Sequence, residues 1–432
     1  MCTTTEAKTL NYSHPLDPLT GEELEAVVEL LRSSASLSEK IRFGSIVLKE
    51  PPKAAVLEWA PESDPLEREA FCILLDNDEN KTMEAVVSLT SSCVVSVEHI
   101  PGVQPAIMLD EFPECEAAIK RSELFRAAIA KRGITDVDLV MVDPWSAGHY
   151  GGDKEERRLI RALCWIKASP TDNGYARPIE GVVPVVDINK MEVIAVEDYG
   201  VVPLPPNDGN YKPEFVKNPR TDIRPIEILQ PEGPSFTVQG QQISWQKWKM
   251  RVGFTPREGL VIHQCSYTDG GVERPIFYRG SLSEMTVPYA DPLPQAYRKN
   301  AFDVGEYNLG TLTNSLKLGC DCLGEIYYFD ATMIGSRGDV CAIDSAVCLH
   351  EEDAGILWKH MDWRTEQTEV RRSRRLVVSF IATVGNYEYG YYWWVTNDAF
   401  AVTALHKGID SYFLLPFSGI FIKTAPFSTK SN

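Results

Sequence analysis

Residues 374–395 read RRLVVSFIATVGNYEYGYYWWV, a run in which β-branched and aromatic side chains follow one another with few polar residues between them. Side chains of these two kinds are enriched in β-strands, because they pack well against neighbours on a pleated surface. Further strand-like runs, separated by turn residues, precede this one at 243–255, 259–269, 274–282 and 325–333. Several strands with turns between them predict an antiparallel β-sandwich or barrel, which we place at 237–398.

Two shorter units precede the predicted sandwich, at 14–106 and 107–200, and each begins with helix signals and continues with strand-like runs. In the first unit, Thr20 and Glu23 have the spacing of a capping box, and apolar residues follow at helical intervals. The run AAVLEWA at 54–60 is expected to be one of its strands. The helices of the second unit are expected at 113–120 and 123–131. The fold class is therefore α+β: two small α/β domains, with internal duplication as one interpretation, then the N-terminal part of a large antiparallel β-sandwich.

Two segments differ from these units in residue composition and in the pattern of apolar residues. Residues 201–236 are rich in proline and turn residues, which predicts a linker laid over a surface. Residues 399–432 lose the alternation of the strands, and we interpret them as a divergent tail. A truncated gene model is the plain explanation of this tail, and a genuine alternative C-terminus is the other.

The composition restricts the class of partner and the compartment. The 432 residues include 43 Lys and Arg against 61 Asp and Glu, a net charge of −18, which argues against nucleic acid and tolerates cationic small molecules. The N-terminus has no signal-peptide pattern, and no stretch is apolar enough for a membrane helix. The terminal TKSN matches no peroxisomal address. We expect an intracellular protein, cytoplasmic or peroxisomal, with no membrane contact.

Several motifs in order along the chain resemble the copper-containing primary-amine oxidases, in particular the fungal-type members. Thr383-Val-Gly-Asn-Tyr-Glu-Tyr389 has the form Thr-x-x-Asn-Tyr-Asp/Glu-Tyr, in which the first tyrosine is converted to topaquinone in this family. VPYADP at 287–292 and FDVGEYNLG at 302–310 resemble the family's gate and catalytic-base segments. Further similar stretches are LGCDCLG at 318–324 and VCLHEEDAGILWKH at 347–360. The resemblance covers residues 14 to about 398.

The resemblance implies oxidative deamination of a primary amine to an aldehyde, with ammonia and hydrogen peroxide as the other products. Ordinary side chains are not usable two-electron acceptors, so a cofactor must oxidise the amine. By resemblance, Tyr387 is the precursor of topaquinone, which forms a Schiff base with the substrate, and Asp303 is the general base. Dioxygen then reoxidises the cofactor. The family's enzymes are homodimers that contain Cu(II) and topaquinone.

The resemblance also implies the residues around the cofactor. Asn386 would enclose its ring, Tyr289 would hydrogen-bond near its oxygen, and Trp145 would line the substrate channel. The remaining expected pocket residues are Ala301, Tyr307, Gly385 and Tyr389. Cys322 and Cys348 stand where the family forms a disulfide, the alternative being two buried thiols. Taken singly, the aromatic residues could be packing residues and Asp303 a turn residue.

The copper ligands are the part of the pattern that the chain lacks. The family holds copper with a His-x-His pair after the quinone motif and a third histidine further on, and imidazole suits Cu(II). The seven histidines are His14, His99, His149, His263, His350, His360 and His406. No two form His-x-His, and we interpret the EEDAG run at 351–355 as a charged turn, so no metal ligand is assigned. Because the resemblance implies that the copper site makes topaquinone from Tyr387, we expect the chain as printed, without these ligands, to be inactive by itself. The alternative function is therefore a catalytically inactive fragment that acts at most as a binding module.

Overall fold

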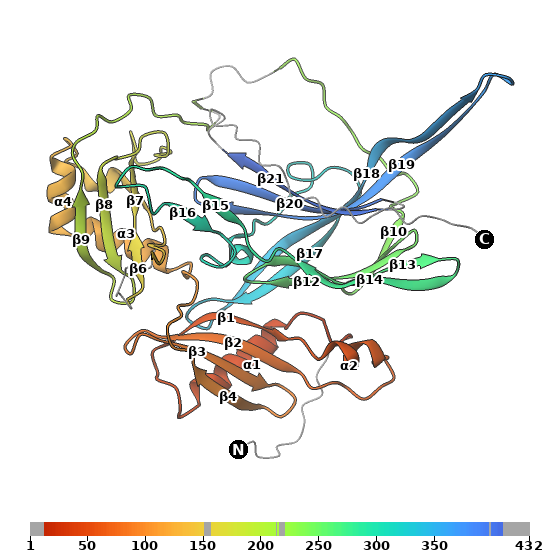
Figure 1. Ribbon diagram of the computed structural model, residues 1–432, viewed down its shortest axis with the longest axis horizontal. Coiled ribbons are helices and arrows are strands. Elements are labelled where there is room, and N and C mark those ends of the chain that lie inside the picture. Colours follow the sequence, from red (N-terminus) through yellow and green to blue (C-terminus); the bar gives the residue numbers. More distant parts are fainter. Residues whose placement is uncertain (1–12, 151–156, 213, 216–220, 397–398, 409–432) are drawn as a thin grey trace.

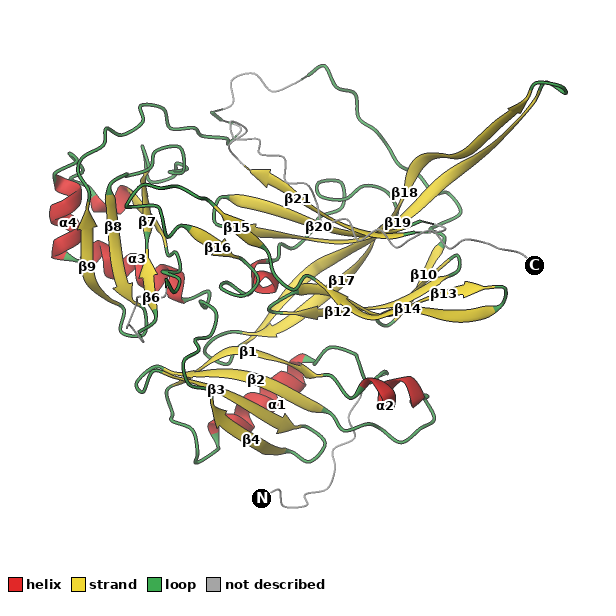
Figure 2. Ribbon diagram, in the orientation of Figure 1, coloured by secondary structure: helices red, strands yellow, loops and turns green. Residues whose placement is uncertain are grey.

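The computed structural model describes residues 13–150, 157–212, 214–215, 221–396 and 399–408. Figures 1 and 2 show three parts: an α+β unit at the bottom, a second one at the left, and a large β part beside them. Most of the regular structure is strand, with few helices, as the predicted fold class requires. The α+β prediction, with two small leading domains before a β-sandwich, is confirmed.

The first unit is a four-stranded antiparallel sheet with one helix packed against it. The sheet runs in the order β1 (Ile41–Lys49), β2 (Glu69–Asp76), β3 (Lys81–Ser88) and β4 (Cys93–His99). Helix α1 (Gly21–Arg32) begins with the capping box formed by Thr20 and Glu23, and it buries Leu24, Val27, Val28 and Leu31. The alternation of apolar residues on the strands supplies the other half of this core.

The prediction of a strand at 54–60 is wrong. Residues Lys53–Glu58 form the short helix α2, and only Val56 of this helix is buried. Pro51 and Pro52 directly precede it, and Pro52 takes the position before the first turn. Because proline cannot supply a backbone donor to a strand, and because lysine and alanine favour a helix, the local chemistry overrides the apolar alternation.

The second unit packs two helices against two small antiparallel sheets. The helices are α3 (Glu111–Arg121) and α4 (Glu123–Ala130), which Figure 2 shows side by side on the outer flank. One sheet pairs β5 (Val140–Asp143) with β7 (Leu163–Ile166). The other has the order β6 (Leu159–Arg161), β8 (Val182–Asp187), β9 (Glu192–Asp198). Between β9 and the next strand at 236, the described residues contain no helix or strand.

The large β part consists of two five-stranded antiparallel sheets that share one core. The first sheet contains β10 (Phe236–Gln239), β11 (Gln242–Trp245), β12 (Trp248–Thr255), β13 (Gly259–Asp269) and β14 (Val272–Ser281). The second contains β17 (Tyr327–Ile334), β18 (Val340–Asp362), β19 (Gln367–Val384), β20 (Tyr387–Val395) and β21 (Phe400–Gly408). Aromatic side chains from both sheets meet between them, among them Trp245, Phe329, Phe380 and Tyr391. This shared core is that of a β-sandwich.

The stretch 374–395 forms a hairpin and not a single strand. β19 and β20 pair up to Val384 opposite Tyr387, so Gly385 and Asn386 form a two-residue turn. Gly385 has a φ of 57°, which glycine adopts without steric cost. The sequence alone did not show this turn because strand-forming residues stand directly on both sides of it.

The charged turn expected at 351–355 is also wrong, because these residues lie inside the long strand β18. β18 and β19 pair irregularly at two points, between Asp353 and Ile356 and between Ile356 and Trp358. Gly355 has a φ of 84° there, so the turn-forming residues make bulges within a strand. Beyond these bulges the two strands continue as a long arm that projects from the sandwich (Figure 1).

The sandwich continues past 398, where we expected it to end. β21 pairs with β20 over its whole length, from Phe400 opposite Val395 to Gly408 opposite Tyr387. The strand therefore extends the sheet by nine residues into the segment interpreted as a divergent tail. The rest of that segment, 409–432, lies outside the described residues.

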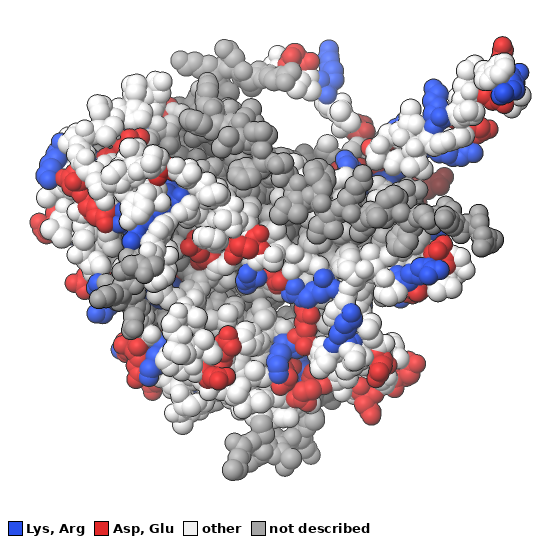
Figure 3. All heavy atoms as spheres, in the orientation of Figure 1, with Lys and Arg blue, Asp and Glu red and all other residues white. Residues whose placement is uncertain are grey.

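The surface carries charges of both signs. On the face shown in Figure 3, acidic and basic side chains are interspersed over all three parts of the molecule. No helix within the described residues is long and apolar enough to cross a membrane.

Candidate active site

A cavity of about 510 Å³ lies where the second α+β unit meets the β-sandwich. One wall comes from the second unit, and the opposite wall comes from the β19–β20 turn and the ribbon of β15 (Thr286–Pro288) and β16 (Asn300–Phe302). The nine pocket and catalytic residues expected from the sequence all line it: Trp145, Tyr289, Ala301, Asp303, Tyr307, Gly385, Asn386, Tyr387 and Tyr389. The fold thus brings four distant segments to one cavity.

Tyr387 is placed by the hairpin turn that precedes it. Thr383 and Glu388 are paired across this hairpin, and the Thr383 hydroxyl donates to the Glu388 carboxylate at 2.9 Å. The side-chain amide of Asn314 donates to the same carboxylate oxygen at 3.2 Å. These bonds explain the spacing of the Thr-x-x-Asn-Tyr-Glu motif, because they tie its first and sixth residues together and leave Tyr387 to face the cavity.

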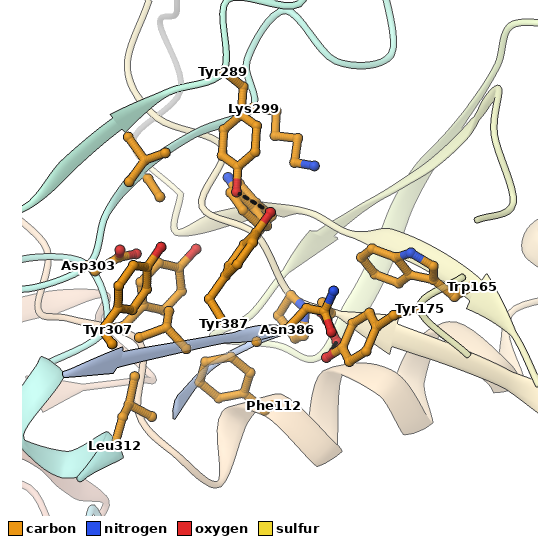
Figure 4. Close-up of a pocket in the computed structure, with 18 of the residues that line it drawn as sticks. Phe112, Trp165, Tyr175, Tyr289, Lys299, Asp303, Tyr307, Leu312, Asn386 and Tyr387 are labelled. Atoms are coloured by element: carbon orange, nitrogen blue, oxygen red, sulfur yellow. Dashed lines mark hydrogen bonds between the residues drawn. The ribbon is translucent and has the colours of Figure 1, made fainter. Parts of the chain in front are cut away.

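Tyr289 lies directly against Tyr387. The Tyr289 hydroxyl donates a hydrogen bond of 3.2 Å to the Tyr387 hydroxyl oxygen, which Figure 4 shows as a dashed line. Burial raises the pKa of Tyr289, and the neighbouring Tyr387 raises it further. Tyr289 therefore remains a neutral hydrogen-bond donor over the ordinary pH range. The side-chain oxygen of Asn386 is buried beside them without a hydrogen-bond partner among the described residues.

Asp303 is a buried carboxyl with a free oxygen. It is 2% exposed, and its Oδ2 has no hydrogen-bond partner within the described part of the chain. Desolvation raises its pKa to about 7, and the nearby carboxylates of Glu306 and Glu284 add to the rise. The loop that carries Asp303 is held by Glu284, whose carboxylate accepts from the backbone N–H of Val304 at 3.0 Å. A fixed carboxyl with a pKa near neutrality suits a general base.

Trp145 and Tyr307 join the second unit to the sandwich part at the edge of the cavity. The Trp145 indole N–H donates to the backbone oxygen of Asn300 at 2.8 Å, and its ring meets that of Tyr289 edge-on at 5.6 Å. The Tyr307 hydroxyl accepts from the backbone N–H of Ser146 at 3.2 Å. These contacts fix the two walls of the cavity relative to each other.

Four further residues that line the cavity, each with a charged, polar or aromatic side chain, were not expected from the sequence: Asp143, Lys299, Trp165 and Tyr175. Asp143 is the last residue of β5 and precedes Pro144 and Trp145. An acidic residue at the end of a buried strand, next to an expected channel residue, was the available signal. Lys299 stands two residues before the expected Ala301, which was a signal of the same kind. Trp165 and Tyr175 had none, because only the tertiary fold brings them to the cavity.

The two cysteines expected to form a disulfide, Cys322 and Cys348, lie together in a small apolar cluster away from the cavity. Both are free thiols in this structure, and a hydrogen bond with Cys348 lowers the pKa of Cys322. The Cys348 sulfur also lies 3.3 Å from Nδ1 of His350. The disulfide remains a prediction.

The donor set for copper is not found among the described residues. They contain no group of three or more His, Cys, Asp or Glu side chains close enough to hold a metal ion. The side chain of His406, the one histidine after Tyr387, lies outside the described part. Residues 409–432 also lie outside the described part, and no copper ligand is assigned among the residues that the structure describes.

Comparison with known proteins gives a match in each of the three parts of the molecule. Three copper amine oxidase family models match it: the N2 domain over 14–100, the N3 domain over 110–214 and the enzyme domain over 237–408. A primary amine oxidase from Arthrobacter sp. (strain P1) is 48% identical over 90% of this chain and 60% of its own length. A peroxisomal copper-containing diamine oxidase from Nicotiana tabacum is 45% identical over 89% of this chain and 54% of its own. The chain thus spans about 60% or less of the length of these relatives.

Solved structures agree with these matches. A copper-containing benzylamine oxidase from Hansenula polymorpha superimposes with a TM-score of 0.83 at 30% identity, over 95% of this chain and 68% of that one. The likeness extends through both leading domains and both sheets of the sandwich, which carry the cavity described above. From its sequence matches and its fold, the chain belongs to the copper amine oxidase family.

Proposed function

We propose that this cavity oxidises primary amines to aldehydes, with dioxygen and water consumed and ammonia and hydrogen peroxide released. The observation that carries the proposal is that Tyr387 and Asp303 line one cavity, with the Asp303 carboxyl buried and one of its oxygens free. Figure 4 shows Asp303 and Tyr387 directed into the same space. A tyrosine at the family's quinone position beside an unpaired base supports amine oxidation better than simple binding.

Tyr387 fits the role of the topaquinone precursor. Its ring lines the cavity, and its hydroxyl oxygen accepts from Tyr289, which holds the ring in one orientation. When formed, topaquinone supplies the two-electron acceptor that no ordinary side chain provides. Because no copper ligand is assigned among the described residues, we derive no step through copper.

The chain's own residues have separate tasks in this proposal. Asp303 takes a proton from the substrate carbon next to the amine nitrogen, and its free oxygen Oδ2 holds that proton. Tyr289 and Asn386 keep the ring of residue 387 in place. Trp145 and Tyr307 close the cavity between its two walls, which limits the access of water.

The long arm supports a homodimer. At its end, β18, β19 and the turn between them carry apolar side chains that are more than 40% exposed: Ile356, Leu357, Trp358, Met361, Trp363 and Val370. Exposed apolar residues gathered on a projecting hairpin are typical of an interface with another chain. We assign a second copy of this chain as the partner, in agreement with the homodimers expected from the family resemblance.

An intracellular location, cytoplasmic or peroxisomal, also belongs to this proposal. Its support is that relatives from Nicotiana tabacum and Pichia angusta are named as peroxisomal enzymes. Fractionation of cells that express the chain with a fluorescent tag would test it, and secretion into the medium would contradict it.

The direct test is peroxide production by the full chain after aerobic incubation with Cu(II). The proposed function predicts hydrogen peroxide and aldehyde in equal amounts when methylamine or benzylamine is added, and none from the Tyr387→Phe variant. Tyr199→Phe, an exposed tyrosine away from the cavity, is the matched control and should behave as the wild type. A folded chain that binds amines without forming peroxide would instead favour the alternative, an inactive chain that acts as a binding module.

A further inference from the structure

A second cavity, of about 480 Å³, lies where both α+β units and the β-sandwich meet, and we call it the junction cavity. The first unit lines it with the start of β1 and the β2–β3 turn, and the second unit with residues 188–191 between β8 and β9. The sandwich contributes residues 336 and 337 from the β17–β18 turn. The junction cavity shares no lining residue with the candidate active site, and the proposed reaction gives it no task.

The lining of the junction cavity carries more positive than negative charge, although the chain as a whole has a net charge of −18. Its cationic residues are Arg32, Lys40, Arg42, Lys190 and Arg337. Of the three carboxylates that line it, Asp78 lies 2.8 Å from the ammonium of Lys40 and Glu114 lies 2.5 Å from the guanidinium of Arg337. The third, Glu39, is exposed. The excess of positive charge favours an anion as the ligand.

Two of these cations have no carboxylate partner within the described part of the chain: Arg32 and Lys190. The guanidinium of Arg32 donates to the backbone oxygen of Arg337 and lies 5.8 Å from the centroid of the Phe43 ring. These contacts hold Arg32 at the cavity without neutralising its charge. Lys190 reaches the same cavity from the exposed turn between β8 and β9. A ligand with two negative charges would compensate both cations.

Two lining residues also carry buried polar atoms without a hydrogen-bond partner among the described residues, Nε of Arg42 and Oδ1 of Asn77. Arg42 is 8% exposed, and its other nitrogens are engaged, for example with the Ser336 hydroxyl at 3.0 Å and with Asp110 at 2.6 Å. A buried polar atom without a partner costs free energy. A ligand that accepts from the Arg42 N–H and donates to the Asn77 oxygen would remove both costs.

Hydrogen phosphate has this combination of groups. Its unprotonated oxygens accept hydrogen bonds, its P–OH group donates one, and its charge is about −2 at pH 8. Guanidinium groups such as those of Arg32 and Arg42 match the oxygens of a phosphate with parallel N–H donors. A carboxylate ion carries one charge and no donor, so it leaves one cation and the Asn77 oxygen without a partner.

We propose that the junction cavity binds a phosphate group, either free or in a small monoester that carries a hydroxyl group. Arg32 and Lys190 compensate its charge, and Arg42 and Asn77 supply the hydrogen bonds. The site is independent of amine oxidation, because none of these four residues lines the active-site cavity. It can therefore be present whether or not residue 387 becomes a quinone.

The test is calorimetric titration of the full chain at pH 8, in a buffer without phosphate, with inorganic phosphate, glycerol phosphate and acetate. We expect a Kd below about 1 mM for at least one of the two phosphates, and an affinity for acetate that is about tenfold lower or less. Tighter binding of inorganic phosphate would identify the free ion as the ligand, and tighter binding of glycerol phosphate a monoester. Absence of binding of both phosphates at about 10 mM, or equal affinity for acetate, would overturn the proposal.

A substitution assigns the binding to the junction cavity. Lys190→Glu places a negative charge there and should weaken phosphate binding about tenfold or more, whereas Lys190→Arg should keep most of the affinity. Lys190 is exposed, so neither change should disturb the fold, and circular dichroism checks this. Lys317→Glu, the same change at an exposed lysine that does not line the cavity, is the matched control and should bind as the wild type. Equal losses in Lys190→Glu and Lys317→Glu would show non-specific attraction and contradict the assignment.

Discussion

Asp303 and Asp143 are two carboxyls of one cavity, and burial raises the pKa of both, to about 7 and about 6. Their surroundings differ. Asp303 keeps one oxygen without a hydrogen-bond partner among the described residues, and its nearest charges are the carboxylates of Glu306 and Glu284. Asp143 accepts from the hydroxyl of Tyr175, whose ring meets that of Trp165.

This difference separates a carboxyl that is free to take a proton from one that is held by a hydrogen-bond donor. A carboxyl with a free oxygen and like-charged neighbours gains a proton readily near neutral pH, as a base must. A carboxylate that accepts from a phenol is held in one orientation, and the hydrogen bond favours its charged form. The same side chain thus differs in its acid–base behaviour between two environments, and a change to one environment should leave the other carboxyl unaffected.

The largest expected effect comes from Asp303→Asn. Removing the base should lower kcat for amine oxidation about 10²- to 10⁴-fold, which an assay of peroxide release with benzylamine would measure. The amide keeps the shape of the side chain, so residue 387 should still acquire the quinone, and quinone staining of the variant is the control. A variant with quinone and with kcat within a few-fold of the wild type would remove Asp303 from the mechanism.

The pH dependence of kcat sharpens the same comparison. The carboxylate form of Asp303 is the active one, and its raised pKa means that this form is lost as the pH falls through about 7. We expect kcat to decrease about tenfold per pH unit below 7 and to be constant above it. The variant Glu284→Gln, which retains an acceptor oxygen for the loop, should move the midpoint to lower pH because one neighbouring negative charge is gone. A midpoint near 4 in the wild type would show an ordinary, solvated carboxyl.

The smallest effect is expected at the far end, from Tyr175→Phe. The phenol hydrogen bond lowers the pKa of Asp143, so its loss should raise that pKa and leave less carboxylate at pH 6. We expect the Asp143 carboxyl to titrate at a higher pH in the variant than in the wild type, as measured by the pH dependence of its carboxyl carbon-13 resonance. An unchanged midpoint would assign Tyr175 a packing role.

Much of this site could be predicted from the sequence, because the motifs carry it. Tyr387, Asp303 and Tyr289 stand in three short segments that resemble motifs of a known family, and the structure places all three at the cavity. The capping box at Thr20 was equally local, and it formed. Short motifs such as this capping box depend on residues that are close in the sequence. The tertiary fold therefore does not change the local structure that they predict.

The rest depends on contacts between distant segments. Gly385 and Asn386 became a turn because two strands pair on either side of them, and the turn-like run with Gly355 became a bulge because β19 continues beside it. Trp165 and Tyr175 reach the cavity only through the packing of two domains. Sequence patterns indicate the backbone conformation and burial that a segment prefers. They do not indicate which other segment of the chain packs against it.

The measurement that tests the central claim most directly is peptide mapping of the full chain after aerobic incubation with Cu(II). The digested protein is stained for quinone, and the stained peptides are sequenced. Our account predicts one quinone peptide, the one that contains Tyr387, and none in the Tyr387→Phe variant. A folded chain with no quinone in any peptide, or with quinone at another tyrosine, would contradict the claim that this cavity is built around a quinone at residue 387.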